Sequence, residues 1–530
     1  MRYQLINMAK SKLLAKLELV KKALYIWAVQ YHFVIPKDIL KMYIRKFTHE
    51  SENISKYANR YFDPASKEEY NQWLSYQEYP KTDFDDIAFL SEQDILNLSS
   101  VETGYVCLYG KDVTFYDTFK GCLSFCKDYD VLYFDHDHQD ADGNRCDPEI
   151  KPDFSYNTLR GFNYIGNCVV VKTELMKQFE GQKWNIYRWL LELSDQKVRF
   201  GNVQKVVYCD RGAETSQAET LESYLQEHQI DAQVYRNPDG ISHTVRYSVE
   251  GNPKVSLIIP TRDGKDVLKV CIDSIYEKTT WPNFEIIIAD NGSIKEETLT
   301  YFREMEKAHD NIKVVRLDCP FNFSYINNRA VEQSSGDYIV LLNNDTSVVT
   351  EDWLERMLGY AQRENVGSVG VKLWYPDGSI QHGGVIVGKG GAAAHRYYRC
   401  EHNEKGYLHT LDVPNDVMCC TAACLMTSRR CWNEMNGLNE DLTVQFNDVD
   451  YGIRLYEAGY FNVFLPDVEL IHYESKSRGI DKKKEAVERF FQEVNWAKET
   501  YGKYIEHDPF YSDNFDKNYD YKLKAGTGSN

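Results

Sequence analysis

The sequence predicts an α/β fold with a mostly parallel sheet in its C-terminal half, and three observations support this prediction. Short apolar segments alternate with helix-like segments from Val255 onward, at the spacing of βαβ units. The apolar segments are nearly continuous, as in strands that are covered on both faces of a sheet. Each apolar segment ends in polar or charged residues, which indicates a ligand site at the carboxyl edge of the sheet.

The order of elements in this half follows from the same pattern. We expect strands at 255–260, 284–290, 312–317 and 336–345, with helices after the first strand through Tyr276, at 295–308 and near 326–334. Because the carboxyl ends of parallel strands meet at one edge, the segments PTRD (260–263), DNGS (290–293) and NND (343–345) are expected to lie together. Another helix is expected to start near Asn447.

The N-terminal half has a different pattern. Residues 1–80 are expected to be helical and to end in a polar, tyrosine-rich stretch. After this stretch we expect strands at 86–90, 105–110 and 130–137. A helix is expected at 215–229, followed by a polar link near 236–242. The domains that we predict are a basic helical region (1–83), a first α/β module with a linker helix (84–250), a C-terminal α/β domain (251–515) and a flexible tail (516–530).

The charge of the 530 residues is unevenly distributed. The formal net charge is −18, which argues against a general nucleic-acid binder, since such proteins need Lys and Arg to neutralise phosphates. Residues 1–47 nevertheless carry a charge of +8, so the remainder carries −26. Apolar residues recur at helical spacing between Leu13 and Trp27, so this basic segment is expected either to lie on an anionic membrane surface or to pack on the protein itself.

No secretory signal and no apolar run of about 20 residues is present in the sequence. The 13 cysteines show no metal-ligand spacing, and an odd number without a signal fits reduced thiols. We therefore expect a cytoplasmic protein that is either free or peripheral at the inner face of the plasma membrane.

Three residues could carry chemistry in the C-terminal half. Asp345 follows an apolar strand and two asparagines, so its carboxylate could hold a hard divalent cation with His472 as a second ligand. Asp448, near a helix start, could be a general base for an acceptor hydroxyl. The alternatives are a turn or cap for Asp345, a surface histidine for His472 and helix capping for Asp448, with Asp450 and Arg454 as an i,i+4 ion pair.

The C-terminal half resembles family 2 glycosyltransferases with the GT-A fold, in particular the bacterial two-module enzymes that build O-antigen, rhamnan and other cell-surface polysaccharides. The segments that carry the resemblance run in family order from about 254 to 511: VSLIIPTRDG, YEKTTWPNFEIIIADNGS, PFNFSYINNRAV, GDYIVLLNNDTSV, IQHGGVIVG, TAACLM, FNDVDYGIRLYEAGY, IHYESKSRG and DPFY.

The resemblance implies a role for each matching residue. It implies Asp448 as the catalytic base, with Asn447 in place of the Glu of the family's ED motif, and Asp345 and His472 as ligands of Mg²⁺ or Mn²⁺. The nucleotide-sugar-binding residues that it implies are Pro260, Thr261, Asp263, Asp290, Asn328, Asn343 and Asn344. The acceptor side is expected to include Trp374, Gln381, His382 and Asn447, because Trp374 and Tyr375 lie near the QHGG segment.

Residues 129–176 resemble the first module of the same two-module proteins. No equivalent of the IIPTRD segment precedes them, so the resemblance implies a GT-A-like module whose nucleotide-binding start is degenerate. Asp135 and Asp137 could bind a metal ion, although acidic loop residues are usually solvated. We expect this module to be a docking platform for an acceptor or a partner.

Together these observations predict an inverting glycosyltransferase that moves a hexose from a UDP- or dTDP-sugar to a hydroxyl of a growing, lipid-linked cell-surface glycan, with a homo-oligomer as a further expectation. The alternatives are a sugar nucleotidyltransferase and a non-catalytic glycan-binding or scaffold protein. A nucleotidyltransferase usually needs a glycine-rich basic phosphate loop, whereas PTRDGKD has one glycine. A scaffold would not need the complete set Asp290, Asp345, Asp448 and His472.

Overall fold

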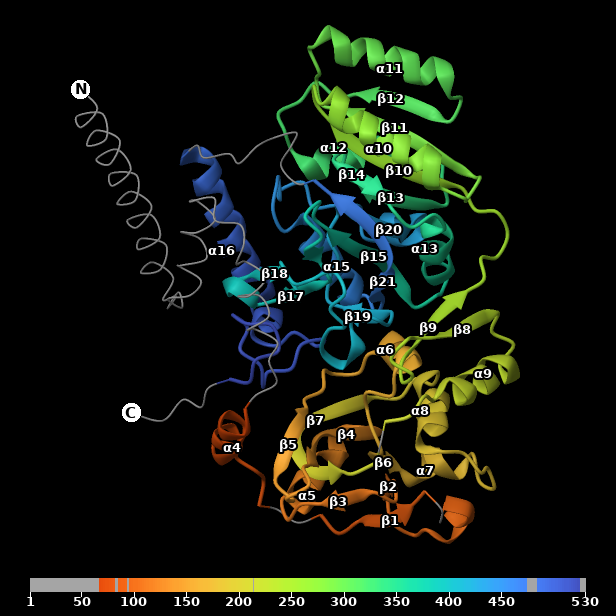
Figure 1. Cartoon of the computed structure of the whole chain (residues 1–530), viewed down its shortest axis with the longest axis vertical. Coiled ribbons are helices and arrows are strands. Elements are labelled where there is room, and N and C mark those ends of the chain that lie inside the picture. Colours follow the sequence, from red (N-terminus) through yellow and green to blue (C-terminus); the bar gives the residue numbers. More distant parts are fainter. Residues whose placement is uncertain (1–65, 82–83, 93–94, 213, 474–483, 525–530) are drawn as a thin grey trace, which may run out of the picture. The chain divides into compact units, whose positions relative to one another are not determined.

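The computed structural model describes residues 66–524 except 82–83, 93–94, 213 and 474–483 (Figure 1). The basic segment 1–47 therefore lies outside the described residues. Helix α4 (Lys67–Ser75) begins with a capping box, in which Ser66 Oγ accepts from Glu69 N–H and Glu69 accepts from Ser66 N–H. Tyr70 and Trp73 of this helix are buried, so part of the stretch predicted to be polar belongs to the core.

The first sheet has seven strands in the order β1-β2-β6-β4-β7-β3, with β5 paired to β4. Strand β4 is parallel to β7 and antiparallel to β6, and this mixed pairing places both faces of β4 in the core. The strands are β1 (Ile87–Ser91), β2 (Tyr105–Tyr109), β3 (Val113–Phe115), β4 (Val131–Gln139), β5 (Arg145–Glu149), β6 (Cys168–Lys172) and β7 (Phe200–Asp210).

Short helices cover this sheet, and a hairpin follows it. The helices are α5 (Phe119–Cys122), α6 (Tyr156–Gly161), α7 (Thr173–Lys177), α8 (Ile186–Ser194) and α9 (Ala218–Glu227), with 3₁₀ turns η3 (Ile95–Ser100) and η4 (Leu123–Asp128). The predicted link near 236–242 is the turn of a hairpin between β8 (Ala232–Arg236) and β9 (His243–Tyr247). Asp239 closes this turn by accepting from Ile241 N–H and Ser242 N–H, which a polar link in the sequence does not reveal.

The second sheet has ten strands, and its path runs β12-β11-β10-β13-β20-β15-β21-β14. Strands β12, β11, β10 and β13 are parallel, as the sequence predicts, and β20 continues the sheet antiparallel to β13. The strands are β10 (Val255–Thr261), β11 (Phe284–Asp290), β12 (Ile312–Arg316), β13 (Tyr338–Leu342), β14 (Thr346–Val348), β15 (Val366–Trp374), β16 (Ile380–His382), β19 (Asn415–Val417), β20 (Cys424–Ser428) and β21 (Phe461–His472), with a separate pair β17 (Val385–Val387) and β18 (Ala393–His395).

Helices lie on both faces of this sheet. They are α10 (Lys265–Lys278), α11 (Glu296–Ala308), α12 (Phe323–Glu332), α13 (Trp353–Ala361), α14 (Arg429–Glu434), α15 (Asn447–Glu457) and α16 (Lys484–Glu506), with 3₁₀ turns η5 (Lys389–Gly391) and η6 (Tyr407–His409). Helix α12 begins earlier than predicted because Asn322 caps it, accepting from Tyr325 N–H at 3.0 Å. The predicted α/β class is confirmed, and β14, β16, β19 and β20 add antiparallel pairs to the parallel strands of the second sheet.

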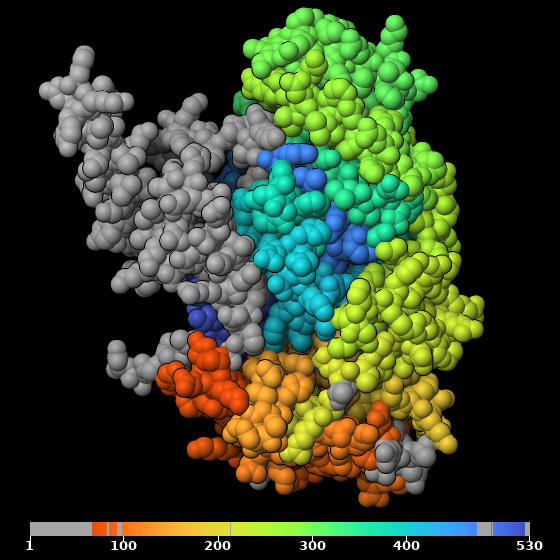
Figure 2. Space-filling view, in the orientation of Figure 1, coloured from red at the N-terminus to blue at the C-terminus, as the bar shows by residue number. Residues whose placement is uncertain are grey.

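One hydrophobic core joins the two sheets through the β8–β9 hairpin. The cluster includes Val106 and Tyr187 of the first module, Tyr247 of the hairpin and Leu257 and Val340 of the second sheet. Each such buried side chain contributes about 1.5–3 kcal/mol to folding. The hairpin packs against α6 and α13, and Figure 2 shows its yellow surface between the orange first module and the green and cyan second sheet.

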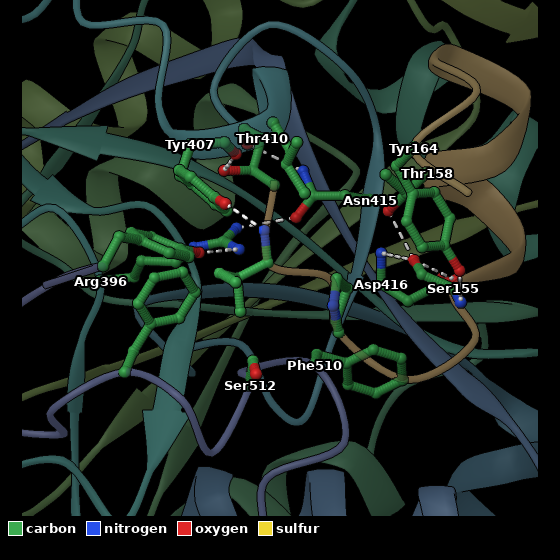
Figure 3. A pocket seen from close by; sticks show the side chains of 15 residues that line it. Ser155, Thr158, Tyr164, Arg396, Tyr407, Thr410, Asn415, Asp416, Phe510 and Ser512 are labelled. Carbon is green, nitrogen blue, oxygen red and sulfur yellow. Dashed lines mark hydrogen bonds between the residues drawn. The ribbon is translucent and has the colours of Figure 1, made fainter. Parts of the chain in front are cut away.

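Buried polar contacts also join the two modules. Asp416 of β19 accepts from Ser155 Oγ at 3.0 Å, from Asn157 N–H at 2.9 Å and from the Asn157 side chain at 2.6 Å. Ser155 and Asp416 lie face to face beside a small cavity that Arg396, Tyr407 and Phe510 also line (Figure 3). The domain boundary predicted at residue 250 stays a prediction.

The segment after α16 returns to the first module. His507 Nε2 lies 2.9 Å from Asp153 Oδ2, and Asn514 Nδ2 donates to Asp135 Oδ2 at 3.2 Å. Residues 516–524 were expected to be a flexible tail, but Asp520 pairs with Lys389 and Tyr521 stacks on Tyr407 at 4.8 Å. The expected tail is therefore corrected for 516–524, because buried aromatic contacts hold it, while 525–530 lie outside the described residues.

Candidate functional site

The three polar strand ends meet at one edge of the second sheet, as predicted. Thr261, the last residue of β10, is in register with Asp290, the last residue of β11. Asn344 follows β13 and donates from its side chain to Thr261 Oγ1 at 2.8 Å. Pro260 is half-buried and pairs with Ala289 within the sheet. The parallel arrangement of β10, β11 and β13 therefore brings the predicted nucleotide-binding segments together.

Asp345 and His472 are brought together by strand pairing. Strand β14 is antiparallel to the end of β21, with Thr346 opposite His472, and Tyr473 N–H donates to the carbonyl oxygen of Asp345 at 2.9 Å. As a result, His472 Nε2 lies 3.0 Å from Asp345 Oδ1, and Asn343 Nδ2 lies 3.3 Å from the same nitrogen. Both residues are buried, which does not fit the alternative of a surface histidine.

The other ring nitrogen of His472 is held by Gln381. His472 Nδ1 lies 2.6 Å from Gln381 Oε1, and because this oxygen can only accept, Nδ1 carries a proton and Nε2 is the nitrogen that faces Asp345. A second hydrogen bond of this kind orients metal-ligating histidines in proteins. The carboxylate of Asp345 and the nitrogen of His472 therefore form a donor set that fits a divalent cation. Gln381, expected on the acceptor side, is buried behind His472.

Asp448 lies in the first turn of α15, where its carboxylate faces the segment before β20. Its Oδ2 accepts from Ala422 N–H at 3.1 Å and its Oδ1 from Val449 N–H at 2.9 Å. Burial raises the pKa of the Asp448 carboxyl above its ordinary value, and these two hydrogen bonds and one from Thr421 oppose the shift. A carboxylate that is more basic than usual is suited to proton abstraction.

The backbone before Asp448 is strained at one residue and is held by hydrogen bonds to a side chain of α16. Phe446, the residue that precedes α15, has φ of +59°, which is rare for a bulky residue. Glu493 of α16, itself buried, accepts from Thr443 N–H, Val444 N–H and Gln445 N–H at 2.8–3.3 Å. Glu493 could not be predicted as a site residue, since it lies 45 residues from Asp448 in a segment without a motif.

The predicted ion pair in the same helix is present. Arg454 Nε donates to Asp450 Oδ2 at 2.8 Å, and Tyr501 of α16 donates to Asp450 Oδ1 at 2.6 Å. Asn447 is buried, accepts from Asp448 N–H at 2.8 Å and donates to the carbonyl oxygen of Val444. Asp450 and Asn447 therefore fix the start of α15 around Asp448.

Two predicted nucleotide-binding carboxylates also have structural partners. Asp263 has φ of +49°, and its Oδ1 accepts from Ile294 N–H and Lys295 N–H at 2.8 Å. Burial acts to raise the pKa of the Asp263 carboxyl, but these hydrogen bonds outweigh it, so the pKa lies below its ordinary value. Asp290 accepts from Ser293 N–H at 2.8 Å and from Arg316 Nη1 at 2.9 Å. Arg316, which the sequence did not single out, is half-exposed at this edge.

Three other predicted residues lie in distinct surroundings. Asn328 bonds to Leu438 and Glu440 through its side-chain amide. His382 is fully buried against His395, with the two Nδ1 atoms 2.9 Å apart, and burial lowers its pKa well below the ordinary value. Trp374 is half-buried against His402, and its Nε1 has no hydrogen-bond partner among the described residues. The Nε1 atom of Trp374 is itself buried, so the structure does not expose it at the predicted acceptor side.

The carboxylate–imidazole pair at the carboxyl edge of the second sheet fits the glycosyltransferase site that the sequence resemblance implies. The comparisons with known proteins agree, because residues 256–429 match the model of Glycosyl transferase family 2. This part of the chain therefore belongs to the family 2 glycosyltransferases.

Two curated relatives are similar over most of the chain. An uncharacterized protein of Sinorhizobium fredii, y4gI, is 37% identical over 412 residues, which are 73% of this chain and 45% of that protein. The O-antigen biosynthesis protein RfbC of Myxococcus xanthus is 35% identical over 378 residues, 67% of this chain and 29% of that protein. The chain thus spans less than half the length of these two relatives.

Among solved structures, a mannosyltransferase of Pyrobaculum calidifontis in complex with GDP-Man and Mn²⁺ is similar at a TM-score of 0.36 and 14% identity. The match covers 53% of this chain and 71% of that one. In the part of the chain that the structure describes, no helix is both long and apolar enough to cross a membrane.

Proposed function

We propose that this chain is an inverting glycosyltransferase that moves a sugar from a nucleotide-diphosphate sugar to a hydroxyl of a growing cell-surface glycan. The observation that carries the proposal is the Asp345–His472 pair at the sheet edge beside Thr261 and Asn344. The similarity to an O-antigen biosynthesis protein supports a glycan product.

We assign donor binding to the strand ends. The nucleotide lies along Pro260, Thr261, Asp263 and Asp290, with Asn328, Asn343 and Asn344 as further contacts. Asp345 and His472 hold Mg²⁺ or Mn²⁺, which when bound offsets the negative charge that develops on the leaving diphosphate. Gln381 supports this role by fixing the His472 ring so that Nε2 points toward Asp345.

Asp448 takes the proton from the acceptor hydroxyl, which attacks the anomeric carbon from the face opposite the diphosphate. A single displacement of this kind inverts the configuration. The Ala422 and Val449 amides hold the carboxylate in place, and its raised pKa strengthens it as a base. Trp374 and Asn447 are assigned to the acceptor side, with Gln381 and His382 behind them.

The test begins with a screen of nucleotide sugars by thermal shift with Mn²⁺ or Mg²⁺, since a ligand that binds the native state raises the unfolding temperature. With the donor identified, Asp448→Asn is expected to retain donor binding but to lose turnover by about a hundred- to ten-thousandfold. Asp441→Asn, an exposed change seven residues upstream, is the matched control. Near-normal turnover in Asp448→Asn would reduce Asp448 to a structural residue.

The products separate the rival functions. Release of a nucleoside diphosphate with an inverted glycosidic bond fits the proposal, whereas release of pyrophosphate identifies a nucleotidyltransferase. A chain that binds glycan but turns over no donor is a scaffold.

We further propose that the acceptor is lipid-linked and that residues 1–47 dock on an anionic membrane surface. Each basic residue near such a surface contributes about 1 kcal/mol to binding. Unchanged vesicle binding after deletion of residues 1–47 would refute the docking.

A further inference from the structure

A histidine–carboxylate cluster in the first module has no role in the proposed reaction. His136 and His138 are two residues apart in β4, so their side chains lie on the same face of the sheet. Glu149 of β5 lies directly opposite His136. His136 Nε2 lies 3.5 Å from Glu149 Oε2, and His138 Nε2 lies 3.2 Å from Glu149 Oε1. One ligand atom from each of the three residues lies within 4.8 Å of the other two.

We propose that His136, His138 and Glu149 bind a zinc ion. Zinc is held by imidazole nitrogen and carboxylate oxygen at about 2.0–2.2 Å, so two ligands of a tetrahedral site lie about 3.4 Å apart. The two nitrogen–oxygen distances, 3.2 Å to Oε1 and 3.5 Å to Oε2 of Glu149, are each close to this value, so the carboxylate faces the ion with both of its oxygens. Three protein ligands leave a fourth position for water or another ligand.

The second nitrogens of the two rings support this assignment. His138 Nδ1 lies 2.8 Å from the carbonyl oxygen of Asp210, so it carries a proton and orients the ring with Nε2 toward Glu149, as a second hydrogen bond orients metal-ligating histidines. His136 is buried, stacks on Tyr208 and has no hydrogen-bond partner at Nδ1 among the described residues. Within the described part of the chain, its Nε2 has one polar contact, the 3.5 Å approach to Glu149, so a buried imidazole lacks the close partner that a metal ion supplies.

The surroundings leave room for the fourth ligand. The three residues line a cavity of about 70 Å³ together with Asn163, Asn167 and Glu214. Phe162 and Ile241 also line the cavity, but most of the lining side chains are polar, so the cavity suits a metal-bound water. This cluster is distinct from the Asp345–His472 pair, which belongs to the second sheet.

The experiment measures zinc in the full-length chain without a histidine tag. After dialysis against metal-free buffer, the wild type is expected to bind one zinc per chain in competition with a chromogenic chelator. His138→Gln and Glu149→Gln are expected to lose this zinc. His228→Gln removes the histidine of another His–Glu pair in the same module, His228–Glu192 at 3.1 Å, and is expected to retain it. Asp345→Ala, which affects the proposed catalytic cation, is also expected to retain it.

If a variant fails to fold, Co²⁺ binding to the wild-type chain tests which ligands hold the metal ion. Co²⁺ in the wild type is expected to show the visible bands of a tetrahedral site without a thiolate-to-metal charge-transfer band, since no cysteine belongs to the cluster. The proposal fails if the thiolate band appears, if wild-type zinc binding is no tighter than that of His138→Gln, or if no zinc binds at all. In the last case the cluster is an ordinary ion pair, whether or not the chain transfers sugars.

Discussion

The two sheets carry aspartates near the ends of comparable strands, but the partners of these aspartates differ. In the first sheet, the Asp137 carboxylate accepts from Tyr70 OH and Tyr116 OH at 2.6 Å and from Arg145 Nε at 2.5 Å. In the second sheet, His472 is the one side chain among the described residues that is bonded to the Asp345 carboxylate.

The difference shows what separates a structural carboxylate from one that can bind a ligand. Three donors occupy three of the about four lone-pair positions of the Asp137 carboxylate, so a metal ion bound there would compete with a buried network. Asp135, also fully buried, accepts from Lys151 N–H and Asn514 Nδ2. The expectation that these acidic residues are solvated is therefore wrong, because both are buried and hydrogen-bonded within the first module.

The largest effect is expected from a substitution that removes the carboxylate of the site in the second sheet. Asp345→Ala is expected to abolish metal-dependent donor binding and to lower turnover by at least about a hundredfold, because a bound metal ion supplies several kcal/mol of charge stabilisation. Its free energy of unfolding should fall by less than about 1 kcal/mol. Calorimetric titration with nucleotide and Mn²⁺, beside urea unfolding, measures both quantities.

The counterpart in the first sheet is expected to behave in the opposite way. Asp137→Ala leaves Arg145 as a half-buried charge without its carboxylate and should lower the free energy of unfolding by about 3–5 kcal/mol, while donor affinity at low temperature is unchanged. If Asp137→Ala weakened donor binding as much as Asp345→Ala does, the contrast between the two sheets would be wrong.

A smaller effect is expected where α16 supports Asp448. In Glu493→Gln, one acceptor oxygen becomes an NH₂ group that faces the amides of residues 443–445, which disturbs the segment before Asp448. We expect kcat to fall about tenfold with an unchanged donor KM, the signature of a displaced base. The exposed Glu499→Gln on the same helix is the control, and equal kinetics in both variants would mean that Glu493 has no positioning role.

The smallest expected effect concerns the bond between the C-terminal segment and the first module. Hydrogen bonds to Asp153 and Asp513 raise the pKa of His507 to about 10. The charged form is favoured in the folded state, so its stabilisation is complete below the ordinary pKa of about 6.5 and is lost as the pH rises toward 10. Because His507 is partly exposed, we expect His507→Asn to cost about 1 kcal/mol at pH 6.

Urea unfolding at pH 6, 8 and 10 checks this difference, which should shrink with rising pH. His309→Asn is the control, since His309 stacks on Tyr276 at 4.2 Å. A cost for His507→Asn that is independent of pH would show that packing, and not charge, holds the segment.

Much of the second sheet could be predicted because its signals are local. The strands around 255–290 are runs of β-branched residues, and their polar ends must share an edge once the strands are parallel. The Asp450–Arg454 pair follows from helical spacing alone. Such features depend on residues that are close in the chain.

The remaining features depend on pairings over long distances in the chain. Gln381 reaches His472 across 91 residues, and Glu493 reaches the segment before Asp448 across about 50. The saturation of Asp137 requires a tyrosine 67 residues away. No residue pattern encodes such contacts, since each depends on the register of strands or on where a helix packs.

The return of the C-terminal segment to the first module bears on the order in which the protein is completed during synthesis. The partner of Asp153 is His507 and the partner of Gln204 is Ser512, and each partner is synthesised more than 300 residues later. Domains usually fold in the order in which they leave the ribosome. Here the first module is synthesised early but forms its last polar contacts only after both sheets have been translated. A nascent chain that stalls before residue 507 therefore exposes a first module without these contacts to chaperones and proteases.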